Sequence, residues 1–131
     1  MFQAKTLMKT QVTTVTRTMD IYEAIRIMVD GHVTGLPVVG DDGTLVGVIT
    51  EKDVLELLIN SKDQPGAVED YMTHDVLAFE ETDSLVDIAE CFLEKNIRRV
   101  PIVRDGKVVG IISRRDIVRF ILQSRRKAVS V

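Results

Sequence analysis

Two stretches of the chain decide the fold: residues 31–54 read GHVTGLPVVGDDGTLVGVITEKDV, and residues 95–118 read KNIRRVPIVRDGKVVGIISRRDIV. Pro37 aligns with Pro101, and one residue fewer in the second turn then aligns Gly47 with Gly110. The correspondence also pairs Asp53 with Asp116 and, before these stretches, Met8, Val12 and Thr18 with Met72, Val76 and Thr82. Because an internal repeat defines the unit of folding, we expect two similar units related by a pseudo-two-fold axis. A cleft between such units is a place where ligands bind.

Each repeat predicts the element order strand, helix, strand, strand, helix, which is a mixed α/β (α+β) fold. In repeat 1 the pattern favours strands over residues 12–16, 36–39 and 45–50 and helices over 21–30 and 52–60. Repeat 2 shows the same pattern of strands and helices and ends in a helix over 115–123. An Asp-Gly pair between two apolar runs predicts a hairpin in each repeat. The runs are apolar on consecutive residues, so we expect strands covered on both faces.

We divide the chain into repeat 1 at residues 1–61, a linker at 62–67, repeat 2 at 68–124 and a basic tail at 125–131. The linker contains a Pro-Gly pair, which is a strong turn signal. The whole chain of 131 residues fits one compact domain.

The closing helices at 52–60 and 115–123 have little polar face. A helix that is apolar nearly all round must be covered nearly all round. We therefore expect these two helices to form a homodimer interface, since two-fold dimers are the commonest oligomers. The alternative is that each helix covers only its own sheet.

The charge is distributed unevenly. Residues 98–131 contain 10 of the 17 basic and 2 of the 20 acidic residues, which leaves the preceding 97 residues strongly acidic. This asymmetry favours an anionic ligand or a dimer that pairs the two ends. A nucleic-acid binder is a weaker alternative, because the chain has two tyrosines and no tryptophan to stack on bases.

We expect no catalytic activity, required cofactor or metal. The two histidines and one cysteine build no thiolate zinc site, and no G-x-S-x-G, Walker A or H-E-x-x-H sequence is present. No apolar run approaches the roughly 20 residues of a membrane-spanning helix. The first residues lack the apolar core of a signal peptide, which indicates a cytoplasmic protein.

The most informative polar residues stand where a buried strand is expected to meet a helix. They are Thr50 with Asp53 in repeat 1 and Ser113 with Asp116 in repeat 2. One interpretation is purely structural, because this spacing is that of a capping box. The other is that the free N–H groups at a helix start attract an anionic ligand. The two interpretations are compatible.

Together these features resemble the CBS domain, the repeat named after cystathionine beta-synthase. The resemblance rests on the apolar-Pro segment, the Asp-Gly hairpin and the pattern G-h-h-[ST]-x-x-D (h apolar), each present twice and in register. They read Leu36-Pro37-Val38-Val39, Asp42-Gly43 and Gly47 to Asp53, then Val100-Pro101-Ile102-Val103, Asp105-Gly106 and Gly110 to Asp116. The resemblance covers nearly the whole chain and implies two repeats packed sheet to sheet.

The resemblance also implies a function. Tandem CBS modules bind adenosyl compounds, commonly AMP, ADP, ATP or S-adenosylmethionine, and regulate a partner protein. It places one cleft at Thr50, Asp53, Val76, Leu77, Ile97, Arg98, Arg99 and Pro101. It places the other at Ser113, Arg115, Asp116, Val12, Thr13, Val33, Thr34, Gly35 and Pro37. In both, the aspartate would hold the ribose hydroxyls.

Arg98 and Arg99 predict a difference between these clefts, because arginine binds phosphate oxygens bidentately. The cleft assigned to Asp53 and Arg99 is therefore expected to prefer phosphorylated ligands. The cleft of Asp116 and Thr34 is expected to take adenosine or S-adenosylmethionine, or nucleotide more weakly. The rival hypothesis is an interaction scaffold that binds no ligand.

Overall fold

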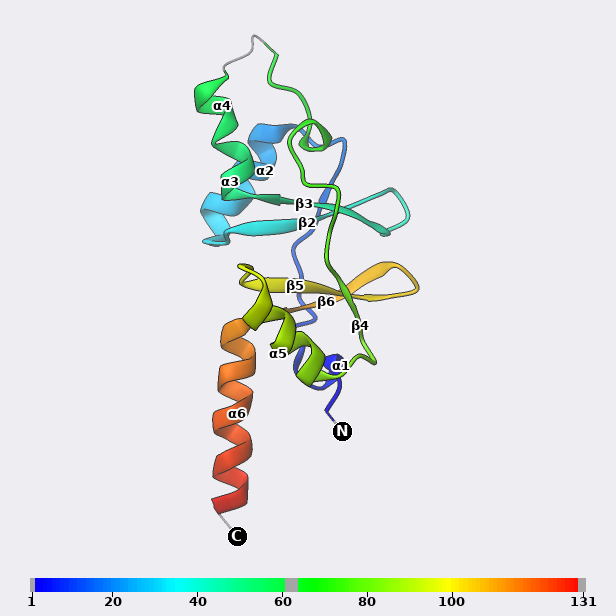
Figure 1. Cartoon of the computed structure of the whole chain (residues 1–131). Helices are drawn as coiled ribbons and strands as arrows, with labels where there is room; N and C mark the ends of the chain where they lie inside the picture. Colours follow the sequence, from blue (N-terminus) through cyan, green and yellow to red (C-terminus); the bar gives the residue numbers. More distant parts are fainter. Residues whose placement is uncertain (1, 61–63, 130–131) are drawn as a thin grey trace. The chain divides into compact units, whose positions relative to one another are not determined.

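The computed structural model describes residues 2–60 and 64–129, with side chains up to residue 125 (Figure 1). The chain folds into two compact units. The first-repeat unit consists of Thr13–Val76 with Gly106–Val108, and the second-repeat unit consists of Met1–Val12, Leu77–Asp105 and Val109–Val131. Position 61 of predicted repeat 1, positions 62–63 of the predicted linker and positions 130–131 of the predicted tail lie outside the described residues.

The first-repeat unit contains a three-stranded sheet of order β1-β2-β3. Strand β1 (Val15–Thr16) runs parallel to β2 (Gly35–Val39), and β2 is antiparallel to β3 (Leu45–Thr50). Helix α2 (Ile21–Gly31) connects β1 to β2, and α3 (Glu51–Val54), α4 (Glu56–Ile59) and the 3-10 turn η1 (Val68–Asp70) follow β3. The predicted element order is confirmed, although β1 is shorter than the predicted strand and the closing helix is interrupted at Leu55.

The second-repeat unit has the same plan, with a sheet of order β4-β5-β6. Its strands are β4 (Phe79–Glu80), β5 (Arg99–Arg104) and β6 (Lys107–Ser113). Its helices are α1 (Ala4–Leu7), α5 (Leu85–Glu94) and α6 (Arg114–Val129). Strand β4 is parallel to β5, and helix α5 forms the connection from β4 to β5 (Figure 1). The packing of one sheet on the other stays a prediction.

Each unit has its own apolar core, built by the strands and the first long helix. In the first-repeat unit Ile21, Leu36 and Ile49 are almost completely buried. In the second-repeat unit Ile88, Ile102 and Ile112 are completely buried. Pro37 and Pro101 lie inside buried strands. Consecutive residues of β2 and β5 are buried, which confirms that both faces of these strands are covered.

The predicted hairpins form, and local hydrogen bonds shape the first. Gly43 adopts a φ of 86° and Gly106 a φ of 79°, a left-handed conformation that glycine tolerates best. The backbone N–H of Thr44 donates to Asp42 Oδ1 at 3.0 Å, and this bond lowers the pKa of the Asp42 carboxyl. By contrast, the side chain of Asp20 makes no cap to α2, although its backbone forms an isolated bridge with Ala67.

The leading segment of each repeat packs on the sheet of the other repeat's unit. Residues 2–12 belong to the second-repeat unit, where Lys9 exchanges backbone hydrogen bonds with Ile111 at 3.0 Å. Residues 64–76 belong to the first-repeat unit, where Thr73 pairs with Val48 in the same way. The spatial units therefore cross the boundaries drawn from the sequence.

One glycine in the third strand of each sheet allows this close approach. A Cβ on Gly110 would lie 2.6 Å from Met8 Sδ and 3.1 Å from the carbonyl oxygen of Lys9. A Cβ on Gly47 would lie 2.7 Å from Met72 Sδ and 2.9 Å from the carbonyl oxygen of Thr73. Both repeats therefore have glycine at this position for a steric reason.

We predict that Gly110→Ala lowers the free energy of unfolding by about 1–3 kcal/mol, because the added methyl group overpacks the contact with the leading segment. The measurement is a urea unfolding curve of the full chain. Gly31→Ala is the control, since its nearest neighbour would be 3.8 Å away at Val33. Equal stability of the two variants would contradict the steric explanation.

Candidate functional site

The second-repeat unit turns from strand β6 into helix α6 through a reciprocal cap. The backbone N–H of Ser113 donates to Asp116 Oδ2 at 2.9 Å, and the N–H of Asp116 donates to Ser113 Oγ at 3.1 Å. Each bond satisfies a backbone donor that the helix leaves free. The predicted capping box is therefore present.

The first-repeat unit repeats this geometry where β3 meets α3. The N–H of Thr50 donates to Asp53 Oδ2 at 2.9 Å, and the Thr50 hydroxyl donates to the same oxygen at 3.0 Å. The N–H of Asp53 approaches Thr50 Oγ1 at 3.4 Å. The other carboxylate oxygen, Oδ1, accepts a bond of 3.3 Å from the Thr73 hydroxyl.

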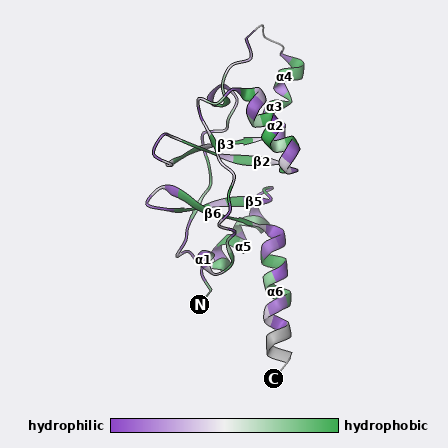
Figure 2. Ribbon diagram, turned by 180° about the vertical axis from the view of Figure 1, so that it is seen from behind, coloured by the Kyte–Doolittle hydropathy of each residue, from purple (hydrophilic) through white to green (hydrophobic). Residues whose placement is uncertain are grey.

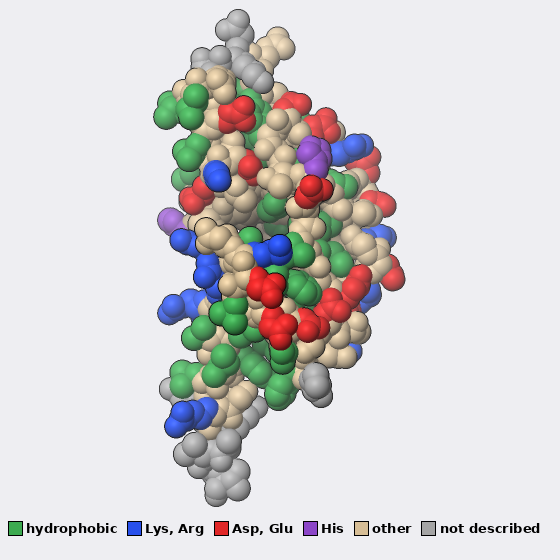
Figure 3. Space-filling view, in the orientation of Figure 1, with side chains coloured by type: hydrophobic (Ala, Val, Ile, Leu, Met, Phe, Trp, Pro, Cys, Tyr) green, Lys and Arg blue, Asp and Glu red, His purple; other side chains and the backbone are tan. Residues whose placement is uncertain are grey.

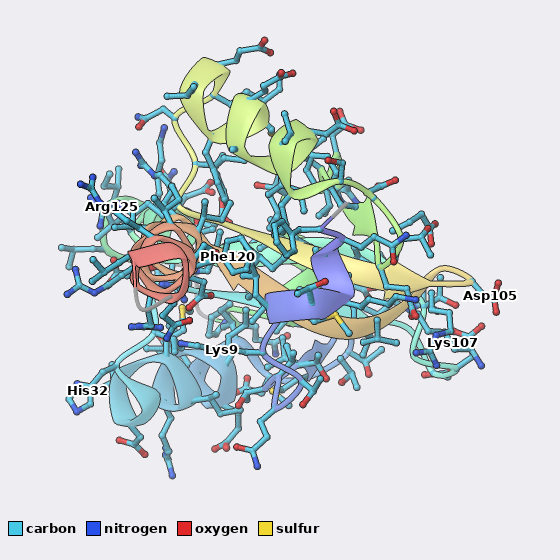
Figure 4. The ribbon with its side chains drawn as sticks, turned by 90° about the horizontal axis from the view of Figure 1, so that it is seen from below. Lys9, His32, Asp105, Lys107, Phe120 and Arg125 are labelled. Carbon is cyan, nitrogen blue, oxygen red and sulfur yellow. The ribbon has the colours of Figure 1, made fainter. Side chains whose placement is uncertain are left out.

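Asp116 is the one charged side chain classed as buried among the described residues, with 6% of its surface exposed. Its Oδ1 lies 3.5 Å from Lys9 Nζ and 3.4 Å from Arg119 Nη1. Lys9 comes from the leading segment and Arg119 from the second turn of α6 (Figure 4 labels Lys9). A buried charge needs such partners, so the two cations stabilise the ionised carboxylate.

A pocket of about 520 Å³ opens beside this corner within the second-repeat unit. Basic side chains dominate its wall, and Figure 3 shows Lys and Arg side chains gathered near the start of α6. The lining residues are Lys9, Arg98, Arg99, Ser113, Arg114, Arg115, Asp116 and Arg119. A concave site with this many cations suits an anionic ligand.

One donor in this wall has no partner among the residues that the structure describes. Arg99 Nε is buried, and no hydrogen-bond acceptor lies within reach of it among the described residues. A buried donor left unpaired costs free energy, whereas an anion in the pocket supplies acceptors. The guanidinium of Arg99 is thus suited to bind a ligand oxygen.

The structure groups the arginines with the corner of their own repeat. Antiparallel pairing places the start of β5 beside the end of β6, and the N–H of Arg114 donates to the carbonyl of Arg98 at 2.9 Å. In the first-repeat unit the N–H of Glu51 likewise donates to the carbonyl of Thr34 at 3.0 Å, and Gly35 pairs with Thr50.

Sequence reasoning had assigned Arg98 and Arg99 to the cleft of Thr50 and Asp53. The structure brings five predicted site residues together at one pocket: Arg98, Arg99, Ser113, Arg115 and Asp116. It also shows that the phosphate-binding candidates adjoin Asp116, the aspartate expected to take the less charged ligand. A shared site of Asp53 with the two arginines stays a prediction.

The remaining predicted residues lie in or just before strands, or where the chain passes from one unit to the other. Ile97 and Val33 pack against the cores of their own units. Val12 and Thr13 mark one boundary between the units, and Val76 and Leu77 mark another. His32, labelled in Figure 4, and His74 are exposed. Within residues 2–60 and 64–129, no group of three or more His, Cys, Asp or Glu side chains is placed to hold a metal ion.

Three residues of the pocket wall lie outside the set of site residues predicted from the sequence: Lys9, Arg114 and Arg119. Arg119 stands three positions after Asp116 on a helix, a spacing at which opposite charges meet, so it carried a usable signal. Lys9 carried none, because its contact with Asp116 depends on the leading segment joining the second sheet.

A family model described as the CBS domain matches residues 4–60 and 68–123 of the chain. Protein MJ1225 of Methanocaldococcus jannaschii is 34% identical over 115 residues, a match that covers 88% of this chain and 41% of that protein. The chloroplastic CBS domain-containing protein CBSX1 of Arabidopsis thaliana is 33% identical, over 83% of this chain and 58% of its own length. The chain thus spans about half the length of these relatives.

Solved structures with the same fold include complexes with adenosine-containing ligands. A crystal structure of CBSX2 in complex with AMP is 35% identical and has a TM-score of 0.87, covering 95% of this chain and 99% of that one. The CBS domain pair of MJ0100 with 5-methylthioadenosine and S-adenosyl-L-methionine is 29% identical with a TM-score of 0.79, covering 94% and 98%.

An enzyme also contains this pair of repeats as a small part of its chain. Inosine-5'-monophosphate dehydrogenase of M. jannaschii is 37% identical over 98 residues, and the match covers 74% of this chain but 19% of the enzyme.

We predict that Asp116→Ala lowers the free energy of unfolding by about 1 kcal/mol, because it removes a helix cap. Lys9 and Arg119 are 62% and 52% exposed and regain water when the carboxylate is lost. Thermal or urea unfolding measures the change. Glu94→Ala, on an exposed position at the end of α5, is the control, and an equal loss in both variants would argue against the cap.

Proposed function

Because the chain belongs to the CBS-domain family and carries two copies of its repeat, we propose that it is a regulatory module that binds an adenosine-containing ligand without turnover. The crystal structures of CBSX2 with AMP and of MJ0100 with S-adenosyl-L-methionine support this class of ligand. AMP, ADP, ATP and S-adenosylmethionine are the candidates.

The observation that carries the proposal is the pocket at the Ser113–Asp116 corner. A carboxylate has about four acceptor sites, so Asp116 caps α6 through Oδ2 and keeps capacity to accept ribose hydroxyls. The positive end of the α6 helix dipole attracts phosphate. Arg98 and Arg99 line the same pocket and have donors for phosphate oxygens.

The Thr50–Asp53 corner is the proposed second site. Its cap has the same geometry as that of Ser113 and Asp116, and Asp53 is less buried than Asp116. Thr34 and Gly35 stand where the other repeat has Arg98 and Arg99. This corner therefore offers ribose recognition with less positive charge for phosphate.

We further propose a homodimer formed through α4 and α6. Apolar side chains on these helices are exposed in the single chain: Leu58 by 86%, Ile59 by 79% and Val118 by 64%. Figure 2 shows hydrophobic segments along both helices. Exposed apolar residues in such number favour a protein interface and argue against helices that cover only their own sheets.

Ligand binding would regulate a partner protein by shifting the population of two arrangements of the module. The cytoplasm stays the predicted compartment. Among the described residues, no helix has both the length and the apolar character that crossing a membrane requires.

We predict that AMP raises the melting temperature of the protein and that Arg98→Ala weakens AMP binding about ten-fold, the usual effect of losing a charge-assisted bond. Isothermal titration calorimetry of the full chain measures the affinity. Arg26→Ala, on the exposed face of α2, is the matched control. No thermal shift with AMP, ADP, ATP or S-adenosylmethionine would favour the ligand-free scaffold instead.

We predict that Leu58→Asp and Val118→Asp each convert a dimer into a monomer, because a carboxylate cannot be buried unpaired in an apolar interface. Light scattering after size exclusion measures the mass. Leu93→Asp, on α5 and 87% exposed, is the control that leaves the dimer intact. Dissociation by Leu93→Asp alone would place the interface on α5.

A further inference from the structure

The pocket at the start of α6 concentrates more positive charge than one phosphate group needs. Around the single carboxylate of Asp116 stand six cationic side chains, a formal balance of +5: Lys9, Arg98, Arg99, Arg114, Arg115 and Arg119. We call these residues with Ser113 the basic corner. Like charges brought together repel one another, so this arrangement is best stabilised by a ligand with several negative charges.

The aligned residues of repeat 1 carry a net charge of the opposite sign. Arg114 and Arg119 of repeat 2 correspond to Glu51 and Glu56, whereas Asp116 aligns with Asp53 and Arg115 with Lys52. The three carboxylates and one ammonium give a formal balance of −2. We call this set, with Thr34, Gly35, Thr50 and Thr73, the acidic corner.

The two corners share one backbone frame, so the charge reversal comes from the side chains. In both, the N–H of the first helical residue donates to the carbonyl of the residue just before the middle strand. Arg114 donates to Arg98 at 2.9 Å, and Glu51 donates to Thr34 at 3.0 Å. In both, the leading segment contacts the aspartate Oδ1, through Lys9 at 3.5 Å or Thr73 at 3.3 Å. A neutral hydroxyl thus stands where the basic corner has an ammonium.

The cations of the basic corner divide into two groups. Lys9 and Arg119 pair with Asp116 and neutralise it. Among the described residues, Arg98, Arg99, Arg114 and Arg115 form no ion pair with a protein carboxylate, and Arg99 Nε has no acceptor. With Asp116 neutralised, four guanidinium groups are left to face a ligand.

Resting on the proposed function, we infer that the basic corner selects a nucleoside di- or triphosphate over a monophosphate and over S-adenosylmethionine. Each added phosphate brings further negative charge to a corner that has an excess of positive charge. The sulfonium of S-adenosylmethionine brings a positive charge into the same field. The acidic corner disfavours polyphosphates by repulsion.

Lys9 and Arg119 are the residues that determine the preference for polyphosphates. Without either cation, the charge of Asp116 is less well compensated and opposes the approach of phosphates. The loss grows with the charge of the ligand, so it falls more heavily on a triphosphate than on a monophosphate. If the two residues had only a structural role, their loss would weaken the binding of both ligands equally.

The test is calorimetric titration of the full chain with ATP, ADP, AMP, S-adenosylmethionine and inorganic tripolyphosphate, at low and at high salt. We expect ATP to bind at least about ten-fold more tightly than AMP, roughly the effect of one further charge-assisted contact. The preference shrinks as salt screens the charges. Equal affinity for AMP and ATP, or tighter binding of S-adenosylmethionine, overturns the inference and leaves the proposed function standing.

Variants then assign the preference to residues. Lys9→Gln and Arg119→Gln change half-exposed side chains and are expected to reduce the ratio of ATP to AMP affinity about three-fold or more, within the range of a weakened ionic contact. Arg26→Gln, an exposed cation on α2 that belongs to neither corner, is the control and leaves the ratio unchanged. If both site variants keep the ratio, the two residues do not determine specificity.

Tripolyphosphate separates the two proposals. If it binds while no adenosine-containing ligand does, the basic corner is an anion site and the proposed function fails. If neither it nor any nucleotide binds, both fail.

Discussion

The close contact between Gly110 and the leading segment is the constraint on which the described structure of the second repeat depends. Met8 and Lys9 lie where a side chain on Gly110 would stand. This contact adds a backbone pair to the edge of β6 through Ile111. It also brings α1 against α6, where Phe2 and Phe120 stack edge to face at 4.7 Å (Figure 4 labels Phe120). Lys9 reaches Asp116 as a consequence of the same contact.

The cap of α6 joins folding to ligand chemistry in one side chain. Asp116 satisfies the N–H of Ser113 with one oxygen and holds two cations with the other. Burial would make this charge unfavourable without partners, and its partners are also walls of the pocket. A structural cap and a ligand group are therefore compatible at this position, as the two interpretations of the sequence allowed.

The two repeats diverge in charge while their backbones stay alike. Both corners keep the hydroxyl, the carboxylate and the close glycine, because the strand-to-helix turn and the leading segment require them. The positions between these residues are free to vary. Glu51 and Glu56 in one repeat, against Arg114 and Arg119 in the other, give an electrostatic difference that the fold tolerates because these side chains are exposed.

The sequence by itself determined the repeat, the order of elements, the hairpins and the capping residues, because these depend on local periodicity and on turn and cap chemistry. It also indicated a basic second half. Only the tertiary structure decided that Arg98 and Arg99 adjoin Ser113 and Asp116, since that depends on antiparallel pairing of β5 with β6. Only it placed Lys9 at Asp116, because residues more than 100 positions apart meet when the leading segment packs on the second sheet. Local pattern cannot specify such a contact, and it is this contact that completes the basic corner.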